Sequence, residues 1–348
     1  MAEARVTGGV FEVGVGVKDI DRALAYWRSF GYRPGPLGTL GAGEAAALYG
    51  VDSPLESLRL LHQDADHGLV RLMKWQNGAG PGLGLMALRI PGNRWAVAKT
   101  RNVQMATSHA RMMKAKGEEI WFTEPISRAV GVTPDQAQPF VASFPSKSEI
   151  PIFTPEMRHV VVQRFGHDLP NFGKHNDDSL FGGSQFTQVG ICVERRNMAQ
   201  VEFYGTVLGL QRSPTHTYQI SDFIGGMTGL QKGEELVEVD FDDVRSGPEP
   251  ERQLSGKLRV FIVNPRPGDG NGFAVTNPGN LGFSLYTLRT HDLDGLRDKV
   301  AAGGARAVSP ILTDEFGARA CTFTAPDGYV WTLLDARPAL QEEVHQCC

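Results

Sequence analysis

The chain has 348 residues, of which 41% are hydrophobic and 21% are charged, and its formal net charge is −4. These values are typical of a globular protein long enough for two domains, and they argue against nucleic acid and membrane surfaces as partners. No apolar run approaches the roughly 20 residues that span a bilayer, and the opening MAEARVTGGVFEVG lacks the features of a secretory signal.

The first repeating unit begins with residues 10–17 (VFEVGVGV), which alternate as a half-buried strand. Residues 20–30 have apolar side chains at helical spacing, and Gly31 is placed to end that helix. Two extended runs follow at 57–63 and 68–75. The unit is therefore predicted as a strand, a helix and then further strands.

The second unit repeats this order after a segment rich in glycine and proline. Residues 94–100 are predicted as a strand, and residues 103–116 as a helix that ends at Gly117. The remaining predicted strands of this unit are 119–125, 139–144 and 158–165.

The third unit follows residues 166–185, which are rich in Gly, Asn and Asp and are predicted to be a linker. Residues 186–210 read as an alternating strand, a polar turn and a short helix that ends at Gly209. Its further predicted strands are 217–223, 234–243 and 257–263.

The fourth unit begins with a strand at 283–290 and a helix at 293–303. Its predicted closing strands are 305–313, 319–325 and 329–335. Aligned on their first strands, the four units place Glu12, Trp95, Gln188 and Leu285 at one position. The separations are 83, 93 and 97 residues, which is too long a period for a solenoid.

Four βαβββ units used in pairs resemble the vicinal oxygen chelate superfamily, which includes glyoxalases, bleomycin-resistance proteins, epimerases and extradiol dioxygenases. The residues that carry the likeness are 12–27, 188–210 and 323–335 (FTAPDGYVWTLLD). The resemblance implies an α+β fold of four βαβββ modules in two half-barrel domains. The boundaries expected from it are 1–165 for the N-terminal domain, 166–185 for the linker, 186–338 for the C-terminal domain and 339–348 for a tail.

The resemblance also implies metal ligands on the first and last strands of each module, facing a cleft. In module one those positions hold Glu12 and Arg71, and in module two they hold Trp95 and one of His159, Val161 and Gln163. In module three they hold Gln188 and Arg259, and in module four Leu285 and Thr332. Neither half supplies a complete set of imidazole and oxygen ligands. We therefore expect no standard metal site, although a divalent metal stays open as a cofactor, with Glu12, His159 and Gln188 as its ligands.

Two readings are open for each polar candidate. Glu12 is either a general base or a buried partner of Arg71, because a buried carboxylate needs a partner in either case. His159 is either an acid–base group or a hydrogen-bonded strand residue, and Gln188 either holds a substrate carbonyl or is satisfied by backbone groups. We expect Arg71, Trp95, Gln188, Arg259 and Thr332 to bind substrate.

Two other groups of residues have a simpler interpretation. Glu238, Asp240 and Asp242 alternate along one predicted strand, and we expect them on its solvated face. Cys192 and Cys321 lie in strand-like runs and are expected to be buried thiols, which fits a reducing cytoplasm.

For function, we expect an enzyme acting on a small oxygenated molecule that is partly aromatic or hydrophobic. Isomerase, lyase or ring-cleaving chemistry fits the resemblance, with Glu12 and His159 as the catalytic pair if no metal is bound. The alternative is a metal-free binding or resistance-type protein. The expected partner is a small-molecule ligand, and a homodimer is left open.

Overall fold

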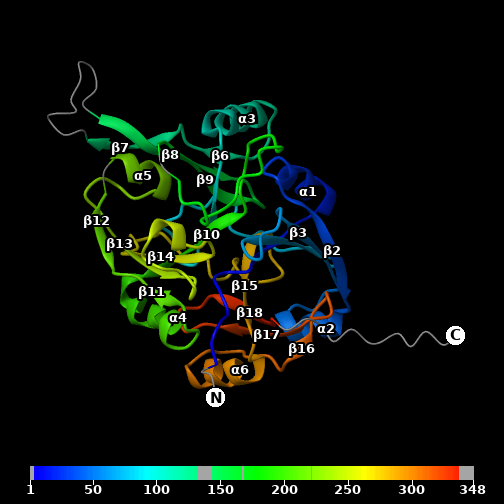
Figure 1. Cartoon of the computed structure of the whole chain (residues 1–348). Coiled ribbons are helices and arrows are strands. Elements are labelled where there is room, and N and C mark those ends of the chain that lie inside the picture. Colours follow the sequence, from blue (N-terminus) through cyan, green and yellow to red (C-terminus); the bar gives the residue numbers. More distant parts are fainter. Residues whose placement is uncertain (1–3, 132–142, 167, 221, 337–348) are drawn as a thin grey trace.

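The computed structural model describes residues 4–131, 143–166, 168–220 and 222–336 (Figure 1). The predicted tail and part of the strand predicted at 139–144 lie outside these residues. In the first module, Asp19 begins α1 by accepting a hydrogen bond from the Arg22 N–H at 3.0 Å, and Gly31, with a φ of +97°, follows its end. This module consists of β1 (Glu12–Gly16), α1 (Ile20–Arg28), β2 (Arg33–Leu40), α2 (Ala42–Tyr49), β3 (Leu55–Leu61) and β4 (Leu69–Trp75).

In the second module, Asn102 caps α3, and the strand predicted at 139–144 is found as the longer β8, which continues to Phe153. The module consists of β5 (Arg94–Lys99), α3 (Val103–Ala115), β6 (Trp121–Phe122), β7 (Ile126–Gly131), β8 (Ser143–Phe153) and β9 (Arg158–Arg164).

The third module differs most from its prediction, because its helix is mainly a 3-10 helix. The capping position holds Glu194, whose side chain makes no capping hydrogen bond, so the first turn lacks the support that Asp19 gives α1. Its elements are β10 (Phe186–Glu194), η1 (Arg195–Glu202), α4 (Phe203–Thr206), β11 (Gln211–Arg212), β12 (His216–Gln219), α5 (Asp222–Thr228), β13 (Glu235–Asp242), η2 (Pro250–Arg252) and β14 (Lys257–Val263).

The fourth module follows the expected order. Asp292 caps α6 by accepting from the Gly295 N–H at 3.0 Å. Its elements are β15 (Gly282–Thr290), α6 (Leu293–Ala302), β16 (Leu312–Thr313), β17 (Arg319–Thr324) and β18 (Val330–Asp335).

The strands form two curled sheets, and neither sheet comes from one half of the chain. The order of the first sheet is β16-β17-β18-β15-β1-β4-β3-β2, and that of the second is β11-β13-β14-β10-β5-β9-β8-β6. Module one therefore shares a sheet with module four, and module two with module three. The expected grouping of modules into an N-terminal and a C-terminal half-barrel is wrong in this respect, because the antiparallel pairs β1–β15 and β10–β5 join the modules across the linker.

Alternate residues of each strand face either a shared core or a separate outer face. Val13 and Val15 of β1 and Ala96 and Ala98 of β5 belong to one large core, which also includes residues of α1, α3 and α6. The opposite face of the first sheet carries a second cluster, and that of the second sheet carries a third. These two outer faces are where a half-barrel forms its cleft.

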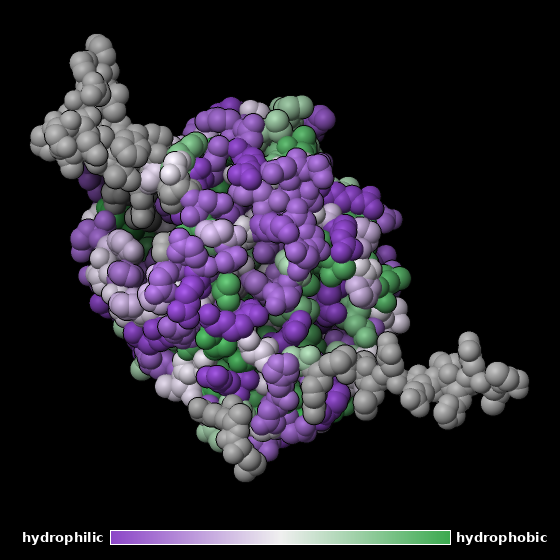
Figure 2. Space-filling model, viewed as in Figure 1, coloured by the Kyte–Doolittle hydropathy of each residue, from purple (hydrophilic) through white to green (hydrophobic). Residues whose placement is uncertain are grey.

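The segment predicted as a linker packs onto the modules. Phe181 lies in the shared core, and its N–H donates to the Ser29 carbonyl at 3.0 Å. On the face shown in Figure 2 the surface is mostly hydrophilic, with hydrophobic residues in small groups. Among the described residues, no helix combines the length and apolarity needed to cross a membrane.

Candidate functional site

Each sheet has one arginine at an equivalent place on its outer face. Arg71 on β4 lies beside β1, two residues beyond the level of Glu12, and Arg259 on β14 lies beside β10, two residues beyond the level of Gln188. The two faces can therefore be compared directly, and they differ in whether a ligand could reach them.

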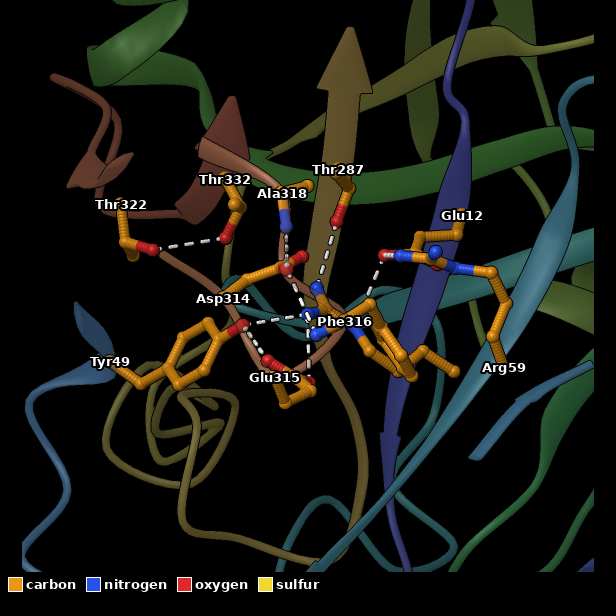
Figure 3. Close-up of polar contacts among 11 residues, drawn as sticks. Glu12, Tyr49, Arg59, Thr287, Asp314, Glu315, Phe316, Ala318, Thr322 and Thr332 are labelled. Carbon is orange, nitrogen blue, oxygen red and sulfur yellow. Dashed lines mark hydrogen bonds and ion pairs between the residues drawn. The ribbon is translucent and has the colours of Figure 1, made fainter. Parts of the chain in front are cut away.

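In the first sheet this face is closed by buried charges (Figure 3). Glu12 and Arg71 are both fully buried, and the Arg71 Nε lies 3.2 Å from the Glu12 carboxylate. Of the two readings of Glu12, this geometry is that of a buried partner of Arg71. Arg59 adds an ion pair at 2.7 Å. Burial raises the pKa of Glu12, but the charges of Arg59 and Arg71 outweigh it, and the pKa is lowered overall.

The rest of the closure comes from α2 and from the loop between β16 and β17. The Arg71 guanidinium donates to the Tyr49 hydroxyl at 2.7 Å, to the Glu315 carboxylate at 3.2 Å and to the Thr287 hydroxyl at 3.0 Å. Thr332 is also buried, and its hydroxyl shares a 3.0 Å hydrogen bond with Thr322. The structure thus buries Glu12, Arg71 and Thr332 completely, the first two in one network of charges and the third in a separate threonine pair.

His159 lies on the other face of the second sheet, in the shared core. Its ring packs edge-on against Phe30 with centroids 4.7 Å apart, and the Tyr26 hydroxyl lies 3.3 Å from its Nε2. Burial lowers the pKa of His159 to about 3, which keeps the imidazole neutral. The structure therefore does not bring Glu12 and His159 together as an acid–base pair, nor with Gln188 as a ligand set.

The outer face of the second sheet contains a cavity of about 200 Å³. Trp95, Gln188 and Arg259, three of the predicted substrate-binding residues, line it. Sequence reasoning missed the other charged lining residues and two side chains from the linker: Lys99, Lys147, Glu149, Arg164, Glu238, Lys257, Leu169 and Phe172.

The floor of the cavity is aromatic. The Trp95 indole lies over Gly190, where a Cβ would overlap the ring. Phe261 packs against the same indole with centroids 4.7 Å apart, and Val97 and Val160 extend the apolar surface. A flat apolar group could rest on this floor.

One wall carries charges that the sequence placed on a solvated face. Arg259 makes two hydrogen bonds to Asp240, at 2.9 and 2.8 Å, and a third contact to Glu238 at 2.9 Å. Glu238 and Asp240 are only 8% and 7% exposed, so the solvated-face prediction is wrong for both. The sequence did contain a sign of this burial. Lys257 and Arg259 on the next strand alternate with the same spacing as the acidic residues, and they supply the positive charges that pair with them.

The two carboxylates of this wall have opposite shifts. Burial raises the pKa of Asp240, but Arg259 and Lys257 outweigh it and lower the pKa to about 2. Burial also raises the pKa of Glu238, and here Arg259 only partly offsets the rise, so its pKa stays above the ordinary value. Of the two carboxyls, Glu238 is therefore the weaker acid and the stronger base.

The opposite wall adds further basic groups. Lys99 forms an ion pair with Asp168 at 2.8 Å, and Lys147 forms one with Glu149 at 3.2 Å. Taken together, the lining contains five basic side chains and two carboxylates. Asp168, Asp240 and Asp242, which do not line the cavity, pair with Lys99, Lys257 and Arg259, so the positive charge that favours an anionic ligand is confined to the cavity surface.

The residues of this cleft do not fit a divalent metal. At the level of Gln188 the sheet carries Val160, Val97 and Lys257, which are two hydrocarbons and an ammonium group. Among these four paired residues, only Gln188 has a side chain that could bind a divalent metal, and Arg259 places a positive charge near it. No cluster of three or more His, Cys, Asp or Glu side chains able to hold a metal occurs within the described part of the chain.

Comparison with known proteins agrees with this architecture. Residues 195–333 match the family model described as the Glyoxalase/Bleomycin resistance protein/Dioxygenase superfamily. No curated protein matches the chain by sequence.

Among solved structures, a putative dioxygenase from Bacillus subtilis has a TM-score of 0.56 at 13% identity, over 97% of this chain and 87% of that one. A glyoxalase I mutant from Zea mays has a TM-score of 0.55 at 14% identity, over 94% of each chain. At these identities the likeness shows a common fold.

Proposed function

We propose that the second sheet binds a small, anionic, partly aromatic molecule and moves a proton on it without a metal. The premises are the match of residues 195–333 to the glyoxalase superfamily model and a fold shared with glyoxalase structures over nearly the whole chain. The observation that carries this proposal is the cavity itself, in which an aromatic floor meets an excess of basic side chains beside the buried Glu238.

Binding would use both surfaces of the cavity. An aromatic ring would rest on Trp95 and Phe261, and a carboxylate would lie near Lys257 and Arg259. The Gln188 side chain can donate a hydrogen bond to a carbonyl oxygen from the edge of the floor. A carboxylate with a neighbouring carbonyl on an aromatic body, as in an aromatic 2-oxo acid, matches this set.

Proton transfer would use Glu238. Its raised pKa makes it a competent base toward a carbon acid next to the carbonyl, and the positive charges of Lys257 and Arg259 would stabilise the enolate that forms. This places the acid–base chemistry on Glu238 in place of Glu12 and His159. An isomerase or a lyase would both begin with this step.

The alternative is a binding protein without catalysis. One observation favours it: Arg259 holds the Glu238 carboxylate at 2.9 Å, which opposes its protonation. A small-molecule ligand is common to both proposals, and we keep a cytoplasmic location as a proposal beside them.

The test uses phenylpyruvate as the probe. Calorimetry should detect its binding to the wild-type protein, and Lys257→Gln should weaken that binding by about five- to tenfold, whereas Lys116→Gln on an exposed helix should not. In D2O, NMR should show faster exchange of the benzylic protons with the wild-type protein, and Glu238→Gln should abolish the exchange while binding persists.

The outcomes separate the two proposals. Binding without accelerated exchange would exclude proton transfer and leave the binding protein. Failure of phenylpyruvate and related aromatic carboxylates to bind would refute the assignment of the cavity. A loss of exchange on chelation, restored by added metal, would contradict the metal-free mechanism.

A further inference from the structure

A second cavity, of about 650 Å³, is lined by residues of α1 and α3, by residues 152–157 and by residues 180 and 181. Figure 1 shows the positions of the two helices. Much of its wall is formed by Tyr26 on α1, Phe30 just after α1, Met113 on α3 and Phe181 in the linker segment. This volume is in the range of sites for small organic molecules, and the wall is largely apolar with a few polar groups.

The hollow results from short side chains where the two helices approach. Ala23 on α1 and Ala106 and Ala110 on α3 line it and are buried. In modules three and four the ends of α4 and α6 approach each other, since a Cβ on Gly303 would lie 2.7 Å from the Val207 side chain.

The charged lining of this cavity consists of three carboxylates, Glu118, Glu119 and Glu156, and two cations, Lys18 and Arg22. Glu118 is paired with Arg22 at 2.6 Å, and the Glu156 carboxylate accepts a hydrogen bond from the Lys18 N–H at 3.3 Å. Within the described residues, neither Glu119 nor Glu156 has a side-chain cation at ion-pair distance. The lining therefore has one carboxylate more than its lysine and arginine side chains, whereas basic side chains outnumber carboxylates in the lining of the other cavity.

Tyr26 adds a polar and aromatic contact. Its ring forms part of the wall, and its hydroxyl has His159 behind it at 3.3–3.4 Å, which is long for a hydrogen bond of a hydroxyl. The hydroxyl can therefore turn toward a ligand, and the ring face can attract a cation.

We infer that this cavity is a second ligand site, which binds a small aromatic cation. The ring system would lie between Tyr26, Phe30 and Met113, and the positive nitrogen would face Glu119 and Glu156. The inference is independent of the function proposed for the other cavity, because the two share no lining residue.

The first test is a fluorescence titration with proflavine, an aromatic cation, and with anilinonaphthalene sulfonate, an aromatic anion. Ala25 lines the mouth on an exposed position of α1, so Ala25→Trp should block the cavity without disturbing the fold. Ala301→Trp, on an exposed position of α6, is the matched control. We expect proflavine to bind the wild-type protein and the control, and Ala25→Trp to weaken it by about tenfold or more.

The second test addresses charge. Glu119→Gln and Glu156→Gln should each weaken proflavine binding by about two- to fivefold, and Glu56→Gln on β3 should leave it unchanged. Thermal unfolding of each variant checks that the fold is retained. The inference is overturned if proflavine binds Ala25→Trp as tightly as the wild type, if both glutamine variants bind it unchanged, or if the anion displaces it with equal affinity from this site.

Discussion

Replacing Arg71 with methionine should strongly destabilise the protein without altering the cavity of the second sheet. Arg71 is fully buried and contacts two carboxylates, Glu12 and Glu315. In the variant Glu12 keeps Arg59, but Glu315 keeps only the Tyr49 hydroxyl, at 2.7 Å. Because one partner of a buried network is removed and a carboxylate is left without its cation, the free energy of unfolding should fall by about 3–5 kcal/mol.

Urea unfolding followed by tryptophan fluorescence measures this loss, and two further variants show its origin. Arg71→Met/Glu315→Gln also removes the carboxylate that Arg71→Met leaves without its cation, and it should recover about 1–3 kcal/mol of the loss. Arg319→Met removes an exposed arginine that pairs with Asp294 and Asp335, and it should cost about 1 kcal/mol or less.

The loss should also depend on pH. In the wild type the pKa of Glu12 is lowered, so its contribution to stability is present above its unfolded pKa and is lost as the pH falls through the folded pKa. Without Arg71 the burial of Glu12 is less well compensated and its folded pKa rises, so the deficit should be larger at about pH 7.5 than at about pH 5. A deficit below about 1 kcal/mol, or one that does not change between these pH values, would refute the reasoning.

Three other predictions concern different parts of the molecule. Gly190→Ala places a Cβ in the Trp95 indole, so it should cost about 1–3 kcal/mol in urea unfolding and weaken phenylpyruvate binding, while a similar change at the open Gly43 should do neither. Burial raises the pKa of Asp327 to about 6, which means that its contribution to stability is greatest below its unfolded pKa and is lost as the pH rises through 6. Asp327→Asn should therefore gain about 1–3 kcal/mol relative to the wild type between about pH 4 and about pH 7, and equal pH profiles would contradict this. Burial raises the pKa of both Cys192 and Cys321, so in a variant without Cys347 and Cys348 a thiol reagent should react only after unfolding, and rapid labelling of the native protein would show that these thiols are accessible.

The modular architecture could be predicted because each module is indicated by patterns among residues that are close together in the sequence. Alternating strands and terminal glycines such as Gly31 and Gly209 recur in each copy, and capping residues such as Asp19 recur in modules one, two and four. Most of the predicted helices lie within a few residues of their predicted bounds. The short α2 was missed, because its eight residues lie between glycine-rich turns and give too little helical periodicity to detect.

The pairing of modules could not be predicted, because alternation shows which residues share a face but not which strand lies beside it. Glu12 and Gln188 occupy equivalent positions, yet one is buried under α2 and a loop while the other lines a cavity. The same limit explains Glu238, whose burial depends on Arg259 of the neighbouring strand.

Because β1 pairs with β15 and β10 pairs with β5, both sheets are built from strands on either side of the linker, and the two halves of the chain depend on each other. A polypeptide cut within 166–185 would give two pieces, each holding half of both sheets, and each piece alone would expose the edges of two central strands. We expect such pieces to be insoluble or to self-associate when made separately, and to reassemble into the native molecule when made together. The protein therefore corresponds to a domain-swapped pair of two-module chains joined into one.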